Sequence, residues 1–528
     1  MSTTSYFLYK KQVSYDGSNW FDVQPSVYSY DGDGSMTPVV KEAHDAFCGA
    51  LPPIYRWVDT QDTMCVGYDK YVVQKRQVSY DNGLTWEDVT PSETRAGSLI
   101  EAYSEDCGYY PPIYKWENMN ISTDYICDDC ETIDYSTQYL TIESLDDDNS
   151  IYWYSSSTSN TKTISASTDG GQTWTAYTSS SVNGTLITTL NTGDKVFIKG
   201  NNSRYGVIDS YYNIFRPAYN KRSIVYGNIM SLIYGDNFSG QTTLTENSTF
   251  YQLFGTSDFR NYGLTSAENL ILPATSLTQD CYNAMFYNCE NLTSAPQLPA
   301  TTLADYCYDR MFFGCSGLTT APALPATTLA QHCYQSMFMH CKNLTTAPVL
   351  SATTLAQHCY NAMFWGCDSL TTAPALPATT LADSCYRGMF YNCISLTTPP
   401  NLSATTLAEW CYNSMFYGCT SLTTAPELPA TTLAKDCYSH MFNGCTNLTT
   451  APVLSATTLA QNCYMYMFYG CSSLNYIKCL ATNISASACL YSWVDGVASS
   501  GTFVKNASMS SWSTGISGIP SNWSVQNA

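Results

Sequence analysis

The sequence contains few charged residues, and basic residues are the scarcer kind. Only 12% of the 528 residues are charged, and 43 acidic residues oppose 23 basic ones, which gives a net charge of −20. Nucleic acids and anionic membrane surfaces attract proteins of the opposite charge. The composition therefore argues against both as partners of this chain.

Long apolar runs and a basic leader are also missing. No stretch of about 18 apolar residues occurs, so we expect no insertion into a membrane. The first eleven residues, MSTTSYFLYKK, lack the basic start and apolar centre of a secretory signal. We therefore expect synthesis in a cytosol without export through a signal peptide.

What the sequence does contain is a strict internal repeat. From Cys281 to Cys489 the chain repeats every 26 residues without insertion or deletion, as L-P-A-T-T-L-A-x-x-C-Y-x-x-M-F-x-x-C-x-x-L-T-T-A-P-x. A unit of this size cannot bury its own apolar face, so the period predicts a solenoid of stacked units. Solenoids usually bind partners over an extended surface, and the positions that vary between copies are the candidates for function.

The apolar spacing within a unit predicts one helix and one short strand. At 100° per residue, one side of a helix holds the apolar residues of a copy: Leu303, Ala304, Cys307, Tyr308, Met311, Phe312 and Cys315. Residues 318–321 form a strand candidate whose pairing ends at Pro322. The predicted fold class is therefore α+β: small β modules and a β-sandwich-like domain, followed by a solenoid with one helix and one short strand in each repeat.

Of the 23 cysteines, 18 lie in the repeats or directly after them. The two cysteines of one unit are eight residues apart, or about 12 Å along a helix, whereas a disulfide requires Cα atoms within roughly 7 Å. Bridges between adjacent units are the alternative, although regular stacking gives every thiol two similar neighbours. We predict two ladders of buried, reduced thiols that act as small apolar side chains.

The rest of the chain divides by composition and by a second, looser duplication. The segments QVSYD and PPIY(R/K)W each occur twice before residue 135, and residues 136–225 contain strand candidates separated by Gly, Asn and Asp. The predicted domains are a β module at 1–68, its duplicate at 69–135, a β-sandwich-like domain at 136–225, a cap at 226–272, the solenoid at 273–489 and a second cap at 490–528.

Two segments, residues 79–86 and 167–174, fit the pattern S-x-D-x-G-x-T-W. They resemble the Asp-box, a β-hairpin motif known from sialidases and many other β-proteins. The resemblance implies that Asp81 and Asp169 tie the turn to backbone N–H groups, while Trp86 and Trp174 pack beneath it. The sequence lacks the arginine cluster that a sialidase needs, so we assign these residues a structural role.

Metal sites have only weak candidates in the sequence. Residues 31–42 have part of the spacing of a calcium loop, but Met36 stands where the sharp turn requires glycine. Cys127 and Cys130 form a lone C-x-x-C, for which zinc and a redox pair are the alternatives to plain thiols. We predict no metal and no other cofactor, with calcium at residues 31–42 as the alternative.

No catalytic arrangement stands out either. The sequence shows no phosphate-binding loop and no paired nucleophile and base. Four histidines occupy variable positions of the repeat, where exposed polar residues are the expected reading: His332, His340, His358 and His440. We therefore predict that the protein is not an enzyme.

The most distinctive variable position follows the invariant Met-Phe pair. Six of its eight copies are aromatic, namely Tyr287, Phe313, Trp365, Tyr391, Tyr417 and Tyr469. On a helix this position lies opposite the buried stripe, so it predicts an exposed aromatic row that suits sugar rings or an apolar partner surface. Trp410, in a neighbouring column, joins these candidates. The alternatives are that the row packs along itself or under a neighbouring domain, or that the strand-side residues after each proline bind instead.

The repeat block resembles the BspA-type leucine-rich repeats of bacterial surface proteins. Those repeats also carry Phe-x-x-Cys, followed by a leucine and a Thr-rich strand. The 26-residue variant with C-Y-x-x-M-F-x-x-C is similar to one found in proteins of gut Bacteroidales and their phages. The resemblance implies adhesion and recognition, and it carries over no catalytic residues.

These observations predict a non-enzymatic recognition protein of a phage virion. We expect a tail- or head-fibre component that contacts a glycan or protein on the bacterial host through its solenoid. The N-terminal modules are predicted to contact other virion proteins, and virion fibres suggest a homotrimer. A bacterial cell-surface adhesin of the same repeat family is the alternative, and a carbohydrate-active enzyme is the third hypothesis.

Overall fold

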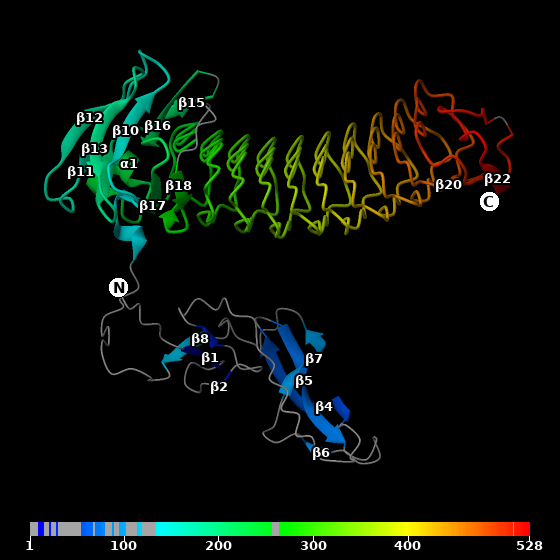
Figure 1. Cartoon of the computed structure of the whole chain (residues 1–528), viewed down its shortest axis with the longest axis horizontal. Coiled ribbons are helices and arrows are strands. Elements are labelled where there is room, and N and C mark those ends of the chain that lie inside the picture. Colours follow the sequence, from blue (N-terminus) through cyan, green and yellow to red (C-terminus); the bar gives the residue numbers. More distant parts are fainter. Residues whose placement is uncertain are drawn as a thin grey trace. The chain divides into compact units, whose positions relative to one another are not determined.

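The computed structural model describes residues 134–208, 210–255, 263–510 and 512–528, together with strands β1 to β8 before them. The chain divides into two compact units, residues 1–131 and 132–528. The first unit consists of short sheets, and the second joins a β-sandwich to a long solenoid (Figure 1).

The two sequence copies of the first unit share their sheets. Strand β1 pairs with β8 and strand β4 pairs with β5, both antiparallel, so each sheet takes strands from both copies. The described strands are β1 Tyr9–Ser14, β2 Phe21–Asp22, β3 Tyr28–Ser29, β4 Ile54–Val66, β5 Asp69–Ser79, β6 Glu87–Asp88, β7 Thr94–Glu101 and β8 Ile113–Asn118.

Two sheets form the sandwich of the second unit. The smaller sheet has the order β13-β10-β16-β15, and the larger has the order β12-β11-β14-β9-β17-β18. Residues of β10 alternate between buried and half-buried, as expected for a strand with one face in the core. The strands are β9 Leu140–Ser144, β10 Asn149–Ser155, β11 Thr163–Ser167, β12 Thr175–Thr178, β13 Thr185–Leu190, β14 Lys195–Gly200, β15 Gly206–Val207, β16 Tyr211–Pro217, β17 Arg222–Asn228 and β18 Gly263–Ser266.

Short helices and strands complete the second unit. The 3-10 helix η2 (Tyr135–Thr137) precedes the sandwich, and α1 (Ser231–Tyr234) and η3 (Gly235–Asn237) follow β17. Strand β19 (Leu270–Ile271) pairs with β17. A parallel sheet of β20 (Tyr476–Cys479), β21 (Thr502–Lys505) and β22 (Ser524–Asn527) closes the C-terminal end. Among the described residues, no helix is long and apolar enough to cross a membrane.

The sandwich passes directly into the solenoid. Strand β17 pairs antiparallel with β9 on one side and parallel with β18 on the other. The parallel pairing then continues as a bridge from Ser266 to Ser294 and along successive coils (Figure 1). The sandwich sheet therefore covers the first open end of the solenoid, as solenoid ends require.

The predicted helix of each repeat is not formed. Residues 305–314 and their equivalents in the other coils form a series of tight turns, and a residue with positive φ recurs every four residues. In one coil these are Tyr306 (φ 60°), Arg310 (φ 54°) and Gly314 (φ 73°). The buried pattern fits a four-residue period better than a helix, because the two cysteines are eight residues apart and would differ by about 80° on a helix.

The turns are stabilised by hydrogen bonds that alternate between two directions. The N–H of Cys307 donates to Ala304 O three residues earlier, at 3.3 Å. The next N–H, from Tyr308, donates to Cys333 O in the following coil, at 3.0 Å, and the alternation continues through Gly314. In an α-helix every N–H would donate to a carbonyl within the same segment. Here every second N–H donates to the following coil, and this bonding between coils replaces the predicted helix.

The predicted short strand is reduced to isolated parallel bridges. Thr320 pairs with Thr346, Leu324 with Leu350 and Thr328 with Thr354, and the same three bridges recur in later coils. The invariant threonines are exposed, whereas the leucines between them are buried. This side of each coil is therefore extended and is held mainly by its neighbours.

Two ladders of aromatic rings run through the core from end to end. The invariant tyrosines stack at about 5.7–6.2 Å between ring centroids, and the invariant phenylalanines at 5.5–5.8 Å. Both ladders begin beside Trp153 of the sandwich, through Tyr205 and Phe215, and both end at Trp493. Sandwich, solenoid and C-terminal cap thus share one continuous core.

The repeat cysteines are free and buried, as predicted. The second cysteine of each coil donates its thiol to the phenylalanine carbonyl of the preceding coil, for example Cys315 Sγ to Phe286 O at 3.1 Å. Burial raises the pKa of the Cys307 thiol to about 12. These thiols are therefore packing groups that also satisfy a backbone acceptor.

The segment predicted as the N-terminal cap contains an additional coil. Ser248 and Gln252 have positive φ, and Phe250 and Phe254 stack on Tyr282 and Phe286 at 5.7 and 5.5 Å. Residues 248–255 therefore follow the same turn pattern without its cysteines. The signal was the four-residue spacing of the two phenylalanines.

Candidate functional site

The turn side of each coil separates invariant from variable residues. Cys307, Tyr308, Met311, Phe312 and Cys315 are each at most 1% exposed. The residue pairs that precede or separate these buried positions, 305–306, 309–310 and 313–314, vary from coil to coil. They include every residue from 305 to 314 that is not buried. The same division holds in the other coils. We call the positions equivalent to residues 305, 306, 309, 310, 313 and 314 the variable face.

The predicted aromatic row lies on this face and is half-buried except at one end. Trp365, Tyr391 and Tyr417 stack with ring centroids 3.9 and 4.3 Å apart, and Tyr287 stacks on Phe313 at 4.6 Å. Met339 separates the two stacks. Tyr469, beyond Asn443, is 42% exposed and meets the Tyr466 ring edge-on at 5.6 Å.

Stacking decides which part of the aromatic row is available. Rings less than about 5 Å apart cover each other's faces, so the Tyr391 ring has both faces covered, by Trp365 and Tyr417. Burial also raises the pKa of the Tyr391 hydroxyl to about 12. The row thus presents ring edges and hydroxyl groups along most of its length, and free ring faces only at the ends of a stack.

A second column of rings runs along the same face. Tyr306, His332 and His358 stack at 4.3 and 4.6 Å, one ring from each of three successive coils. Trp410, the remaining predicted contact residue, lies further along this column between two cations. The Arg387 guanidinium lies 5.2 Å from its ring centroid and the Lys435 ammonium 6.0 Å.

The histidines of the repeat are engaged with neighbouring side chains. His332 Nδ1 lies 2.7 Å from Gln335 Oε1, and His358 Nδ1 lies 2.9 Å from Asn361 Nδ2. Burial lowers the pKa of His358, and the nearby His332 and Arg387 lower it further. The described residues contain no group of three or more acidic, histidine or cysteine side chains that could hold a metal ion.

The strand-side candidates form a separate surface. The residue after each proline is exposed in all seven copies considered: Gln297, Ala323, Val349, Ala375, Asn401, Glu427 and Val453. Val349 is 78% exposed and Val453 46%. This surface carries fewer types of side chain than the variable face, because exposed invariant threonines flank the variable residues.

The second of the segments that resemble the Asp-box, residues 167–174, forms the turn between β11 and β12. Asp169 Oδ1 accepts hydrogen bonds from the N–H groups of Gln172 and Thr173 at 3.0 and 2.9 Å, and Trp174 Nε1 donates to Gly171 O at 2.9 Å. Hydrogen bonds from Ser167 and Thr173 hold the pKa of Asp169 well below its usual range. All these groups act within the turn, and the Lys199 ammonium lies 4.0 Å from the Trp174 ring centroid.

Several predicted residues fall outside the part of the chain that the structure describes. These are Asp81 and Trp86 of the first Asp-box segment, the loop at residues 31–42, and the Cys127–Cys130 pair. Their roles stay predictions.

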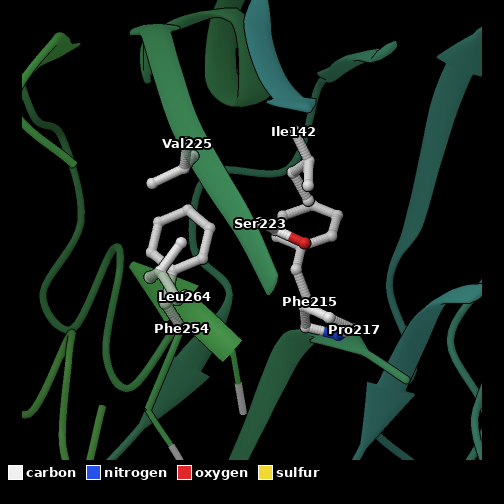
Figure 2. Close-up of a pocket in the computed structure, with 7 residues that line it drawn as sticks. All are labelled: Ile142, Phe215, Pro217, Ser223, Val225, Phe254 and Leu264. Atoms are coloured by element: carbon white, nitrogen blue, oxygen red, sulfur yellow. The ribbon is translucent and has the colours of Figure 1, made fainter. Parts of the chain in front are cut away.

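An enclosed cavity lies where the sandwich meets the first coils. Figure 2 shows apolar side chains from β9, β16, β17 and β18 converging on it, with the hydroxyl of Ser223 among them. Its volume is only about 10 Å³, which is enough for at most one water molecule. The cavity is therefore a gap in the packing rather than a ligand site.

A more open cavity of about 260 Å³ lies on the variable face near its N-terminal end. Sequence reasoning identified only one residue of its lining. The lining residues are Tyr251, Gln252, Asn283, Ala284, Tyr287 and Arg310. The signal was the polar residue that stands two positions after the first cysteine in most copies, such as Asn283, which the helical interpretation left unassigned.

Comparison with known proteins agrees with this architecture. A family model described as a BspA type leucine-rich repeat region, in six copies, matches residues 233–371 and 383–495. The match begins before the first repeat cysteine and includes the additional coil at 248–255. No curated protein and no solved structure matches the chain.

Proposed function

The repeat region of this chain is a BspA-type leucine-rich-repeat region, and from that premise we propose that the protein is the receptor-binding component of a phage virion. Repeat regions of this family are non-enzymatic and commonly serve adhesion and recognition. The proposed role is a fibre-type protein that binds a molecule on the bacterial host surface.

One observation carries the recognition part of the proposal. On the turn side, the residues that differ between copies stand between the invariant Cys, Tyr, Met and Phe of the core, so most of the variation there changes the surface while those core residues stay the same. When a host receptor changes, the solenoid can therefore adapt by substitutions on this surface, or by gain and loss of whole units, and keep its fold. The similarity of the 26-residue unit to phage-encoded repeats supports the virion part.

The recognition surface is tested by two multiple variants of the full chain. Replacing Trp365, Tyr391 and Tyr417 with Ser removes the three-ring stack of the predicted aromatic row, and we expect adsorption of phage to host cells to fall at least tenfold. The matched control replaces Val349 and Val453 with Ser on the strand side, and adsorption should stay at the wild-type level. Loss of adsorption in the control alone would move recognition to the strand side.

The location of the protein is tested by electron microscopy of purified phage with gold-labelled antibodies against the solenoid. Label at a fibre supports the proposal, whereas unlabelled particles rule out the virion role. Label on the surface of uninfected bacteria would instead favour an adhesin of the same repeat family.

A further inference from the structure

The open cavity on the variable face is built from three successive coils. Tyr251 and Gln252 come from the additional coil, Asn283, Ala284 and Tyr287 from the coil of Cys281, and Arg310 from the coil of Cys307. The cavity is therefore a property of the stacked solenoid, because no single unit contains it.

The cavity exists because one short side chain stands between two long ones. Ala284 occupies the same position in its coil as Gln252 and Arg310 do in theirs. The φ angles of Gln252, Ala284 and Arg310 are 55°, 53° and 54°. The backbone accepts larger residues at this position, since His440 and Tyr466 occupy it in later coils with φ of 58° and 53°. The hollow is thus a consequence of sequence rather than of backbone geometry.

A buried carboxylate holds two of the lining side chains from behind. Asp309 Oδ2 lies 3.3 Å from Arg310 Nη1 and 3.5 Å from Asn283 Nδ2. Asp309 is 1% exposed, and its Oδ1 has no hydrogen-bond partner among the described residues. The carboxylate therefore orders the guanidinium and the amide before any ligand arrives, which lowers the entropic cost of binding.

The remaining lining combines an aromatic ring with hydrogen-bonding groups of both kinds. Phe313 covers one face of the Tyr287 ring at 4.6 Å, and no other ring contact of Tyr287 occurs among the described residues. The Gln252 amide, 6% exposed, offers donors and an acceptor, the Asn283 amide, 1% exposed, keeps its oxygen as an acceptor while its Nδ2 contacts Asp309, and Arg310 offers donors only. A ligand with an apolar face and several hydroxyl groups matches this combination.

Charge and size narrow the ligand further. Among the described groups that act electrostatically on Tyr306, in the same coil as Arg310, three are carboxyl groups, Asp280, Asp305 and Asp309, and one is a cation, Arg310. This balance disfavours an anionic ligand. A volume of about 260 Å³ lies below the roughly 300–1,000 Å³ of sites for drug-sized molecules, so one ring of modest size is the appropriate occupant.

We propose that this cavity binds one neutral pyranose residue of a glycan, with its C–H face toward Tyr287 and its hydroxyl groups bonded to Gln252, Asn283 and Arg310. If the proposed function holds, this site identifies the host receptor as a glycan, and that biological role rests on the proposed function. The binding itself belongs to the isolated protein and can be measured without phage.

Saturation-transfer NMR and calorimetry on the full chain test the proposal. The probes are glucose, galactose, mannose and N-acetylglucosamine, compared with N-acetylneuraminic acid and inorganic phosphate. We expect at least one neutral sugar to bind and neither anion to bind. Absence of binding by all four neutral sugars, or binding of an anion alone, would overturn the assignment.

Two variants assign the bound sugar to this cavity. Ala284→His fills the cavity with a residue that the same position carries in the coil of Cys437, and it should weaken binding at least tenfold. Ala362→His makes the same change at the equivalent position two coils beyond Arg310, outside the cavity, and should leave affinity unchanged. Equal affinities in the two variants would contradict the site.

A third variant covers the case in which the filled protein does not fold. Gln252→Ala removes a hydrogen-bonding group without filling space, and it should weaken sugar binding several-fold. Unchanged affinity in this variant would count against the site. Sugar binding by a protein that no virion carries would refute the proposed function alone, whereas normal virion labelling without sugar binding would refute this inference alone.

Discussion

At the scale of single residues, Asp309 is a carboxyl group whose surroundings are unfavourable for its charge. Burial raises its pKa to about 7 from the ordinary value of 3.8, although Arg310 and Asn283 partly offset the effect. Four other coils carry a neutral amide at the equivalent position, as Asn283, Gln335, Asn361 and Asn413. The amide fits the turn without the cost of burying a charge.

The raised pKa of Asp309 makes a prediction about stability and pH. The folded state holds this proton more tightly than the unfolded state, so folding loses stability as pH rises from about 4 to about 7. The loss is at most about 4 kcal/mol, at 1.36 kcal/mol per pKa unit. Asp309→Asn should therefore be more stable than wild type at pH 8 and similar to it at pH 4, as measured by thermal unfolding.

The control for this prediction is Glu427→Gln, which neutralises an exposed carboxyl group in a later coil. Its unfolding temperature should follow that of the wild type at both values of pH. A difference between wild type and Asp309→Asn that does not change with pH would contradict the titration of Asp309.

At the scale of the element, the turn segment depends on residues that accept positive φ. The last such position before the second cysteine is always Gly, Asn or His: Asn288, Gly314, His340, Gly366, Asn392, Gly418, Gly444 and Gly470. Glycine populates this region freely, and Asn and His are enriched there. This recurrence of Gly, Asn and His therefore indicates a left-handed backbone conformation. It could have excluded the predicted helix from the sequence alone.

Gly444 provides a test of this backbone requirement. Its φ is 75°, and an added Cβ would lie 3.6 Å from the nearest atom, Cα of Gly418, so space is available and only the backbone conformation matters. Gly444→Asn should be nearly neutral. Gly444→Val should cost about 1–2 kcal/mol, measured as a lower midpoint of denaturant unfolding. Equal midpoints would show that this turn relaxes at low cost.

At the scale of the whole molecule, residues 132–528 behave as one body because two kinds of contact cross every boundary. The parallel pairing that starts at β17 runs from the sandwich into the coils, and the aromatic ladders run from Trp153 to Trp493. Each coil contacts only its neighbours, so stability accumulates along the stack and both ends require a cover.

This organisation predicts that whole units can be removed but fragments cannot. Deletion of residues 333–358 joins His332 to Cys359 and preserves the 26-residue register, so the variant should fold and its unfolding temperature should change by only a few degrees. Deletion of residues 333–345 removes half a unit and places Thr346 where a buried cysteine belongs. That chain should lose its native circular dichroism, and a native spectrum from it would contradict the nearest-neighbour account.

The sequence alone predicted the solenoid, the buried Cys, Tyr, Met and Phe of each unit and the free repeat thiols, whereas Leu303 and Ala304, predicted as buried, are half-buried. These follow from a strict period and from apolar residues such as Tyr308 and Phe312 that recur in every copy, which is information carried within one unit. The positions that vary, including Tyr391 and Trp410, were equally visible, because variation between copies needs no coordinates.

Only the tertiary structure decided how each unit bonds and which groups its surface offers. A spacing of four residues fits both a helix and a series of turns, and the choice depends on carbonyl groups of the next coil, such as Cys333 O. The stacking that covers the faces of Tyr391, and the cavity bounded by Gln252, Ala284 and Arg310, also arise between coils. Contacts between units leave no pattern within the sequence of one unit. The sequence therefore predicted the solenoid, but it did not predict the hydrogen bonds and surface groups that form between stacked coils.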